Sequence, residues 1–404
     1  MVQSMASTLA SAETQSANRF LPKRILICSS VWMVGGLEVH NVNLSRLLVT
    51  NGAEVTFVTR YAVPGSPAID RLRAVPVRFV TTPLANRTSH LSTAWAMAFW
   101  PRQLRGGFDV LYTFDTTWFA VFLARFVKPT GYVLGSNFGT PNLDSDYLHP
   151  ATRSTLDGFL VESPMQLEAY SNLGVPVKAI PQIGQISAAP ERRPRQIDEL
   201  HVAFMGRLIA AKGIYRLLDM WPSLNIQPAR LDIYGHGPEL ERLEQEIRIR
   251  GLSDCVRLHG EYDAEGLGNI MAHTDLLVFP TNHAEGLPLT LLECMAYGVP
   301  FVASDAGAIP TLAEDNPDVR VVPLEQAAFD RAIEEMSASI RAGQIRGDRL
   351  QEWYRARFGY VQTSKQWLQA LLAPEQFWGP PTRLSHAPTL PGILTRRAWK
   401  IIAK

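Results

Sequence analysis

The sequence predicts an α/β protein built from two doubly wound domains. Its 404 residues suffice for two domains of ordinary size, and a 46% share of hydrophobic residues supplies two cores. Short apolar runs typical of buried parallel strands alternate with helix-period patterns along most of the chain. Residues 188–198, which carry Pro190, Pro194 and several charges, divide this alternation into two series and are predicted to be a linker. Two such domains leave a cleft between the carboxyl ends of their strands, where ligands usually bind.

The first series begins with an apolar strand over residues 24–29. A helical pattern follows from Leu37 to Leu48, and Asn51-Gly52 stops it before a second strand over residues 54–59. The same rhythm continues with strands predicted at 110–112, 131–134 and 158–161. Strand, helix and strand in this order are typical of a doubly wound domain.

The second series has its strands predicted at residues 200–205, 230–234, 256–258, 276–279 and 301–303. Its helices are predicted at residues 214–221, 238–250, 264–272 and 288–297. The chain therefore divides into a disordered leader (1–20), a first domain (21–187), the linker (188–198), a second domain (199–373) and a basic tail (374–404). The last helix of the second domain is a candidate to pack back on the first domain.

The cysteine content and the absence of long apolar runs narrow the class of protein. The three cysteines are far apart and odd in number, which argues against a disulfide framework or a zinc cluster: Cys28, Cys255 and Cys294. This usage favours a reducing cytoplasm. The sequence has no run of about 18 apolar residues, so no transmembrane helix is predicted. Basic residues are scattered without an RNA-binding signature, so nucleic acid is not an expected partner.

Two glutamates eight residues apart, Glu285 and Glu293, are the most informative pair in the sequence. Pro288 lies between them, and proline favours the first turn of a helix. Glu285 then lies in a loop, while Glu293 lies one to two turns inside the helix. Because helical side chains lean toward the N-terminus, both carboxylates can approach one ligand at that helix end. The unpaired N–H groups and positive dipole there suit a phosphate, so the segment predicts a site for a nucleotide-diphosphate sugar.

This segment continues into a longer pattern. Glu285-Gly-Leu-Pro-Leu-Thr-Leu-Leu-Glu293 is followed by Cys294-Met-Ala-Tyr-Gly-Val-Pro-Phe-Val-Ala-Ser-Asp305 and then by Gly307-Ala-Ile-Pro310. Together these residues resemble the donor site of glycosyltransferase family 4, whose signature is a loop Glu, seven residues, then a helical Glu. The resemblance covers roughly residues 24–373. It implies the GT-B fold, in which two Rossmann-like domains face one another across a cleft, and sugar transfer with retention of anomeric configuration.

A second motif, Gly206-Arg-Leu-Ile-Ala-Ala-Lys-Gly213, follows the first strand of the second domain. Arg207 and Lys212 can meet a diphosphate as a fork and as a point charge. Fixed cations there lower the barrier to departure of a nucleoside diphosphate. The alternative is two exposed surface cations, but the motif resembles the family's diphosphate-binding sequence.

The resemblance assigns Glu293 to the ribose hydroxyls and Glu285 to the donor sugar, where it can steady positive charge at the anomeric carbon. The alternatives are a solvated helical glutamate and a loop carboxylate that complements a helix dipole. The predicted catalytic residues are Glu285, Arg207 and Lys212. The predicted donor-binding residues are Arg207, Lys212, Glu285, Gly286, Leu287, Leu289, Glu293, Gly35 and Gly36.

The first domain is predicted to bind the acceptor. Gly35-Gly36 resembles the start of the family's loop facing the diphosphate and acceptor, and His40 of the same motif is either an acceptor contact or a packed core histidine. Where family members often carry His-Gly, this chain has Gly135-Ser-Asn-Phe-Gly139. Asn137 can hydrogen-bond a sugar but cannot shuttle a proton near neutral pH. Front-face attack, in which the leaving phosphate accepts the proton of the acceptor, needs no side-chain base.

We therefore expect a retaining glycosyltransferase that uses a UDP- or GDP-sugar in polysaccharide or glycolipid assembly. Its expected partners are the nucleotide-sugar donor and a glycan or lipid-linked acceptor. No cofactor and no metal are expected. Two alternatives stay open: a same-fold epimerase or phosphorylase, and a non-catalytic nucleotide-sugar-binding partner of another transferase.

A membrane surface is a further candidate partner. The net charge is +4 over residues 21–186, −7 over residues 187–373 and +4 over residues 374–404. On a helical wheel the tail places Leu394, Ala398, Trp399, Ile401 and Ile402 opposite Arg396, Arg397, Lys400 and Lys404. A short basic amphipathic helix with Trp suits an anionic membrane. Residues 91–104, with Trp95 and Trp100, are a second candidate, and the expected location is cytoplasmic, with peripheral binding at the inner face of the membrane. The alternative is that the tail packs on the body or is disordered, and that these tryptophans are core residues.

Overall fold

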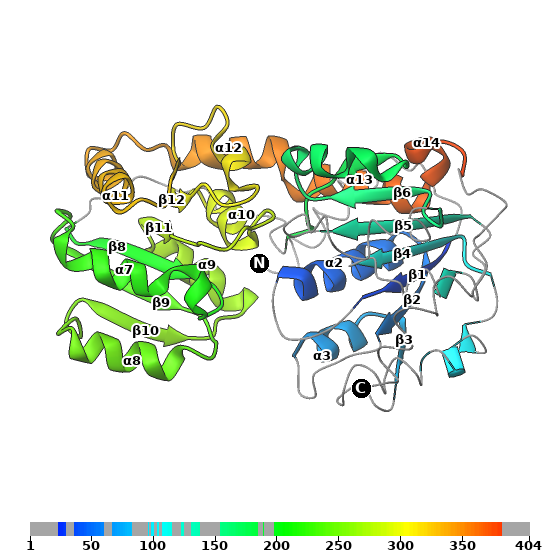
Figure 1. The fold of residues 1–404 in the computed structure, drawn as a ribbon, viewed down its shortest axis with the longest axis horizontal. Helices are drawn as coiled ribbons and strands as arrows, with labels where there is room; N and C mark the ends of the chain where they lie inside the picture. Colours follow the sequence, from blue (N-terminus) through cyan, green and yellow to red (C-terminus); the bar gives the residue numbers. More distant parts are fainter. Residues whose placement is uncertain are drawn as a thin grey trace, which may run out of the picture.

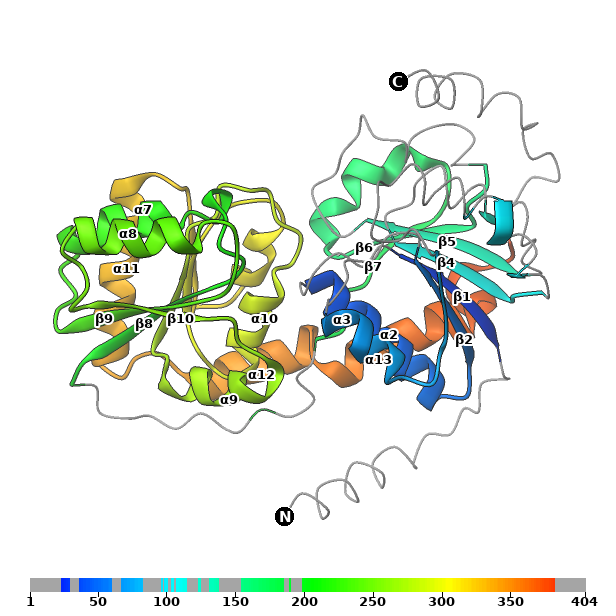
Figure 2. The same cartoon turned by 90° about the horizontal axis from the view of Figure 1, so that it is seen from below.

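The computed structural model describes residues 23–29, 36–59, 67–82, 96, 98–100, 103–104, 107–114, 123–124, 131–137, 154–184, 189 and 198–381. Figure 1 shows two lobes side by side, each a sheet with helices packed on it. The 90° view in Figure 2 keeps the lobes apart and shows the helices α12 and α13 running from one to the other.

The first domain contains, within the described residues, a sheet of seven parallel strands in the order β3-β2-β1-β4-β5-β6-β7. The strands are β1 (Arg24–Cys28), β2 (Glu54–Thr59), β3 (Arg78–Thr81), β4 (Val110–Phe114), β5 (Tyr132–Asn137), β6 (Gly158–Val161) and β7 (Val177–Ala179). Helices α2 (Gly36–Thr50) and α3 (Pro67–Arg73) and the short turns η2 (Pro164–Gln166) and η3 (Glu168–Leu173) complete this part. The reversal of strand order between β1 and β4 is that of a doubly wound sheet.

The second domain repeats this topology with six parallel strands in the order β10-β9-β8-β11-β12-β13. The strands are β8 (Leu200–Met205), β9 (Ala229–Tyr234), β10 (Val256–Gly260), β11 (Leu276–Phe279), β12 (Phe301–Ser304) and β13 (Arg320–Val322). The α-helices are α7 (Ile214–Met220), α8 (Leu240–Ile249), α9 (Ala264–His273), α10 (Leu289–Ala296) and α11 (Gln326–Arg341). Short 3₁₀ turns lie at η4 (Ala210–Lys212), η5 (Trp221–Ser223) and η6 (Ile309–Ala313).

Three C-terminal helices return the chain to the first domain: α12 (Gly347–Arg357), α13 (Tyr360–Leu372) and α14 (Pro374–Trp378). α12 packs against α10, whereas α13 packs against α2. Trp367 of α13 is fully buried, donates its indole N–H to Pro181 O at 2.9 Å and lies edge-on to Tyr112. The predicted tail boundary at residue 374 is wrong, because α14 starts there and Trp378 is buried in the core of the first domain.

The predicted doubly wound α/β class is confirmed, and several strand bounds agree to the residue. β2, β6, β8 and β11 begin and end where the apolar runs predict. The prediction missed β3, β7 and β13, which are short and half-buried, with polar residues among their apolar ones. Partial burial gives such strands no continuous apolar run, so a sequence pattern cannot separate them from loops.

The membrane-binding predictions fall mostly outside the described residues. The tail from residue 382 lies there, as does Trp95. Trp100 is fully buried in the first domain's core with Leu104, so in this structure it has no surface to offer a membrane. Among the described residues, no helix is both long and apolar enough to cross a membrane.

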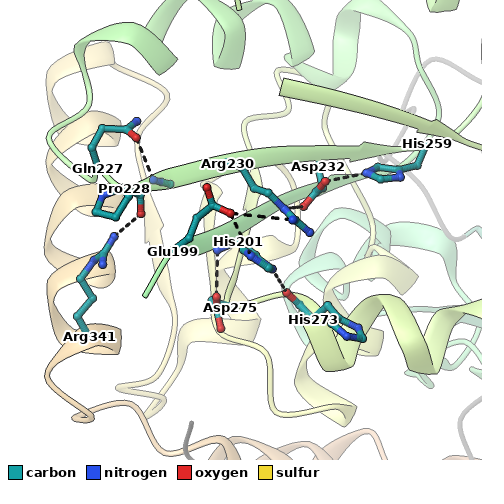
Figure 3. A network of polar contacts seen from close by, with 11 residues as sticks. Glu199, His201, Gln227, Pro228, Arg230, Asp232, His259, His273, Asp275 and Arg341 are labelled. Atoms are coloured by element: carbon teal, nitrogen blue, oxygen red, sulfur yellow. Dashed lines mark hydrogen bonds and ion pairs between the residues drawn. The ribbon is translucent and has the colours of Figure 1, made fainter. Parts of the chain in front are cut away.

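A polar network crosses strands β8, β9 and β10 of the second domain (Figure 3). Its centre is Asp232, whose side chain is buried and accepts from Arg230 Nε at 2.8 Å. The other oxygen of Asp232 lies 2.7 Å from His259 Nε2. Further along, Glu199 lies 3.5 Å from His201 Nε2. Since Glu199 precedes β8 and His201 is near its start, this part of the network lies at the amino ends of the strands, away from the loops that carry Lys212 and Glu285.

Replacing Asp232 with asparagine should lower the free energy of unfolding by about 1–2 kcal/mol, since the amide keeps the size but loses the charge facing Arg230 and His259. Calorimetry should show the melting transition lowered by about 2–4 °C. Asp254→Asn, at an exposed position, is the matched control. Equal melting temperatures for the two variants would contradict a stabilising role for this network.

Candidate functional site

The candidate site lies at the switch point of the second sheet, where β8 and β11 are neighbours. Because the strands are parallel, the loops that follow them emerge at the same edge. The loop after β8 carries Arg207 and Lys212, and the loop after β11 carries Thr281 and Glu285. The fold thus brings together two motifs separated by more than 70 residues.

Lys212 and Glu285 form an ion pair, with Nζ 2.5 Å from Oε1. Only 13% of the lysine side chain and 11% of the glutamate side chain are exposed. Thr281 Oγ1 donates to the same carboxylate oxygen at 2.9 Å, and the ammonium lies 5.4 Å from the ring centroid of Phe279. The sequence assigned Lys212 to a diphosphate and Glu285 to a sugar; the structure adds that they hold each other in place.

Two glycines fix the loops that carry this pair. Gly213 has φ +76°, and a Cβ there would lie 1.8 Å from Pro280 O. Gly307 has φ +63°, and a Cβ there would lie 2.0 Å from Glu285 O. Ala308 N–H donates to that same carbonyl at 2.9 Å. Any side chain at either glycine would push the loops apart, so these positions need both the left-handed backbone and the empty space.

Arg207 lies in the same loop as Lys212, between β8 and η4. It comes two residues after β8, and its side chain is exposed. Within the described part of the chain, no hydrogen bond or ion pair engages its guanidinium. Its fork of donors is therefore available to a ligand, as the diphosphate assignment requires.

Glu293 lies in the second turn of α10, in mostly apolar surroundings. Burial raises its pKa from 4.5 to about 8. Burial raises the pKa of three neighbouring tyrosines, Tyr262, Tyr297 and Tyr354, and the charge of Glu293 adds to the rise. Among the described residues, no hydrogen bond or ion pair compensates this carboxylate. A half-buried carboxylate without a partner is costly, which is typical of a group that meets its partner in a ligand.

The start of α10 differs slightly from the prediction. Pro288 is the N-cap, with φ −60° and ψ 121°, and the helix begins at Leu289. Proline is thus outside the first turn rather than in it. Gly286 and Leu287 are buried in the connecting loop, and Glu285 remains in the loop as predicted.

The N-terminus of α2 approaches this site from the first domain. A Cβ on Gly36 would lie 3.4 Å from Leu289 Cδ1 and 3.4 Å from Gln182 Oε1. The first residues of α2 and α10 therefore meet across the domain boundary, and both helix ends can direct N–H groups toward one ligand. Gly35, the other predicted residue of this loop, lies outside the described residues.

The predicted acceptor residues His40 and Asn137 are both buried, which corrects the assignment. His40 has no exposed surface, accepts the Ile183 N–H at 3.1 Å and packs between Trp367 and Phe114. Burial lowers its pKa to about 3, so it is a neutral core histidine. Asn137 donates to Tyr170 Oη at 2.7 Å.

Glu162 is a site residue that the sequence analysis missed. It directly follows β6 in the first domain, is 1% exposed and accepts the backbone N–H of Leu287 in the second domain at 2.5 Å. Its other oxygen accepts from Gln182 Nε2. Burial raises its pKa to about 8, and Glu285 contributes to the rise by charge repulsion.

Ser163 adds a second contact between the domains, with Oγ 2.9 Å from Thr311 Oγ1.

Metal-ligating side chains do not gather in the described ranges: no group of three or more His, Cys, Asp or Glu there could hold a metal ion.

Two protein-family models match this sequence. Residues 34–182 match "Glycosyltransferase Family 4", and residues 199–339 match "Glycosyl transferases group 1". The second matched region contains the whole second sheet, and the first contains β2 to β7 but not β1; together they include Gly36, Lys212, Glu285 and Glu293. The chain carries a glycosyltransferase family 4 domain followed by a glycosyl transferases group 1 domain.

The chain is similar in sequence to two curated transferases. It is 32% identical over 128 residues to alpha-D-kanosaminyltransferase of Streptomyces kanamyceticus, a match covering 31% of this chain and 33% of that protein. It is 25% identical over 310 residues to phosphatidyl-myo-inositol mannosyltransferase of Mycobacterium leprae, covering 73% and 81% of the two chains. The first match thus spans only about a third of its relative.

Solved structures of the same architecture extend over nearly the whole chain. Sucrose-phosphate synthase from Thermosynechococcus elongatus superposes with a TM-score of 0.71 at 19% identity, covering 88% of this chain and 99% of that chain. The Anabaena protein HepE in complex with UDP gives 0.67 at 18% identity, covering 87% and 100%. The chain therefore has the GT-B fold.

Proposed function

We propose that this chain is a retaining glycosyltransferase that moves a sugar from a UDP- or GDP-sugar to a glycan or lipid-linked acceptor in polysaccharide or glycolipid biosynthesis. The observation that carries the proposal is the donor constellation around the start of α10: the Lys212–Glu285 ion pair in the loop before this helix and the unpartnered carboxylate of Glu293 within it. The names of the relatives support it, since one is a mannosyltransferase acting on phosphatidyl-myo-inositol and the HepE structure holds UDP.

In this proposal the second domain binds the donor. Arg207 and Lys212 contact the diphosphate, Glu293 accepts hydrogen bonds from the ribose hydroxyls, and Glu285 contacts the sugar. Glu285 also restrains the Lys212 ammonium before the donor arrives. A cation already held in position loses little side-chain entropy when the diphosphate binds.

The transfer step needs no side-chain base. The bond between the anomeric carbon and the diphosphate oxygen breaks, and the acceptor hydroxyl attacks from the same face. The proton of that hydroxyl passes to the departing phosphate, so the anomeric configuration is retained. Lys212 and Arg207 stabilise the charge that builds on the diphosphate. This route suits a site in which His40 and Asn137 are buried.

A panel of UDP-, GDP- and ADP-sugars should identify the donor, by thermal shift and by release of the nucleoside diphosphate. The cognate nucleotide should raise the melting temperature. At a hundredfold excess over its Kd, binding adds about 2.7 kcal/mol to the free energy of unfolding. NMR of the product should show the donor's anomeric configuration. Lys365→Ala, at an exposed position on α13, is the control for Lys212→Ala.

Each other outcome decides against part of the proposal. Absence of binding by every nucleotide sugar tested would overturn the donor site. Turnover without an acceptor product, or turnover that requires phosphate, would assign the chain to the same-fold epimerases or phosphorylases. Donor binding with no turnover in the presence of glycan and lipid-linked acceptors would favour a non-catalytic partner.

A further inference from the structure

Outside the donor constellation, the dipeptide Glu162-Ser163 joins the two domains. Both side chains are buried, and each contacts the second domain: Glu162 the N–H of Leu287, Ser163 the hydroxyl of Thr311. They emerge from the carboxyl end of β6, whereas the residues they contact follow β11 and β12. These contacts exist only while the two domains adopt the arrangement seen here.

We propose that Glu162 is a positioning residue that fixes the donor loop, residues 285–289, when the two domains close. The inference rests on the proposed function, since it concerns the same donor site. Leu287 is two residues from Glu285 and two residues before the first residue of α10. A hydrogen bond to the Leu287 N–H therefore restrains the loop between Glu285, where the sugar is expected, and the start of α10.

The partner on the first domain supports this role. Gln182 donates to Glu162 and is only 8% exposed, and its Oε1 has no hydrogen-bond partner among the described residues. That oxygen lies beside Gly36, at the start of α2. One amide thus connects the carboxylate of Glu162 to the helix end that faces α10.

The charges around Glu162 make the contact between the domains depend on pH. Beyond the effect of burial, the one charged group among the described residues that acts on its pKa is Glu285, which raises it and is itself paired with Lys212. Both of its hydrogen-bond partners, Gln182 and the Leu287 N–H, are uncharged. An ionised Glu162 is thus buried without a cation and gains hydration when the domains separate. Because burial raises its pKa from 4.5 to about 8, the closed state weakens as pH rises from 4.5 to about 8.

Three variants separate positioning from mere stability: Glu162→Ala, Glu162→Gln and the control Glu168→Gln, whose side chain is exposed in the same domain. With the identified donor, Glu162→Ala should lower kcat about 10–100-fold while its Kd for UDP or GDP changes less than about threefold, because the residues proposed to bind the diphosphate belong to the second domain. Glu162→Gln should restore kcat to within about fivefold, since its amide oxygen can still accept the Leu287 N–H.

The pH profile of kcat at saturating donor provides the second measurement. The wild-type chain and Glu168→Gln should lose activity as pH rises toward 8 and level off above it, and Glu162→Gln should not. Equal losses of kcat and nucleotide affinity in Glu162→Ala, or no rescue by Glu162→Gln, would overturn the positioning role and leave a structural one.

Hydrogen exchange of the ligand-free protein tests the contact without any substrate. Peptides containing residues 285–289 should exchange at least about tenfold faster in Glu162→Ala than in Glu168→Gln. Unchanged exchange would sink the proposal even if the donor site is correct. Faster exchange in a chain that turns over no nucleotide sugar would keep the domain contact and reject the proposed reaction.

Discussion

Replacing Lys212 with alanine is expected to lower kcat for sugar transfer by about 10²–10³-fold. The lysine ammonium is held by Glu285 at 2.5 Å and is 13% exposed, so it acts on the departing diphosphate from a site that water screens weakly. The loss should fall mainly on kcat, since the charge that it stabilises develops in the transition state. Initial rates at saturating donor and acceptor measure the effect.

The ion pair itself provides the control for this prediction. Lys212→Ala leaves Glu285 without its cation, which would also disturb the loop. The double variant Lys212→Ala with Glu285→Gln removes the stranded charge, and its melting temperature should recover toward that of the wild type. If the double variant regains activity as well, the lysine acts only by pairing with Glu285. Lys365→Ala should keep the wild-type kcat.

Affinity for the nucleoside diphosphate is expected to rise about tenfold between pH 6.5 and pH 8, and Glu293→Gln should abolish this rise. Burial raises the pKa of Glu293 to about 8, so the carboxyl is mostly protonated at pH 6.5, whereas ribose hydroxyls donate best to its ionised form. Calorimetry in buffers of different ionisation enthalpy should detect release of a proton on binding at pH 7. At pH 8.5, Glu293→Gln should bind about 10²-fold more weakly than the wild type.

The carboxyl of Glu293 should also make the free energy of unfolding depend on pH. This stability should fall as pH rises, whereas the affinity for the nucleotide rises. Its folded pKa lies above the model-compound value of 4.5, so the native state holds the proton more tightly than the unfolded chain. Stability is therefore greatest below pH 4.5 as far as this group is concerned, and it is lost as pH rises from 4.5 to about 8. Glu293→Gln should raise the melting temperature at pH 8, and Glu335→Gln, at an exposed position on α11, should not. Equal shifts in both variants would contradict a buried, unpartnered Glu293.

The sequence predicts the parts of this molecule that depend on local pattern. Apolar runs locate β8 and β11 to the residue, and the motifs that follow them place Lys212 and Glu285 at one edge of the sheet. The pairing of these two side chains was not predicted, because the resemblance assigns each to a ligand rather than to the other. The sequence also predicted the helix start one residue too early, at Pro288. Proline is typical of the first turn of a helix, whereas Pro288 is the N-cap here.

Contacts between distant residues are the part that the pattern cannot supply. Glu162 follows a buried strand and looks like any polar residue at a strand end, yet its partner Leu287 is 125 residues away. His40 shows the reverse case, since its position in a motif suggested a ligand while Trp367, from the far end of the chain, covers it. Sequence spacing says which side chains share an element, but it does not say which distant element packs over them.

The return of α13 and α14 to the first domain means that the polypeptide passes between the lobes twice. One passage lies between Gly184 and Asp198, and the other lies at Gly359, where α12 on the second domain gives way to α13 on the first. Two covalent tethers on one pair of rigid bodies restrict sliding and favour rotation about the line that joins them. The donor loop and the start of α2 would then separate along an arc set by the backbone, so each closure returns Glu162 to the same amide.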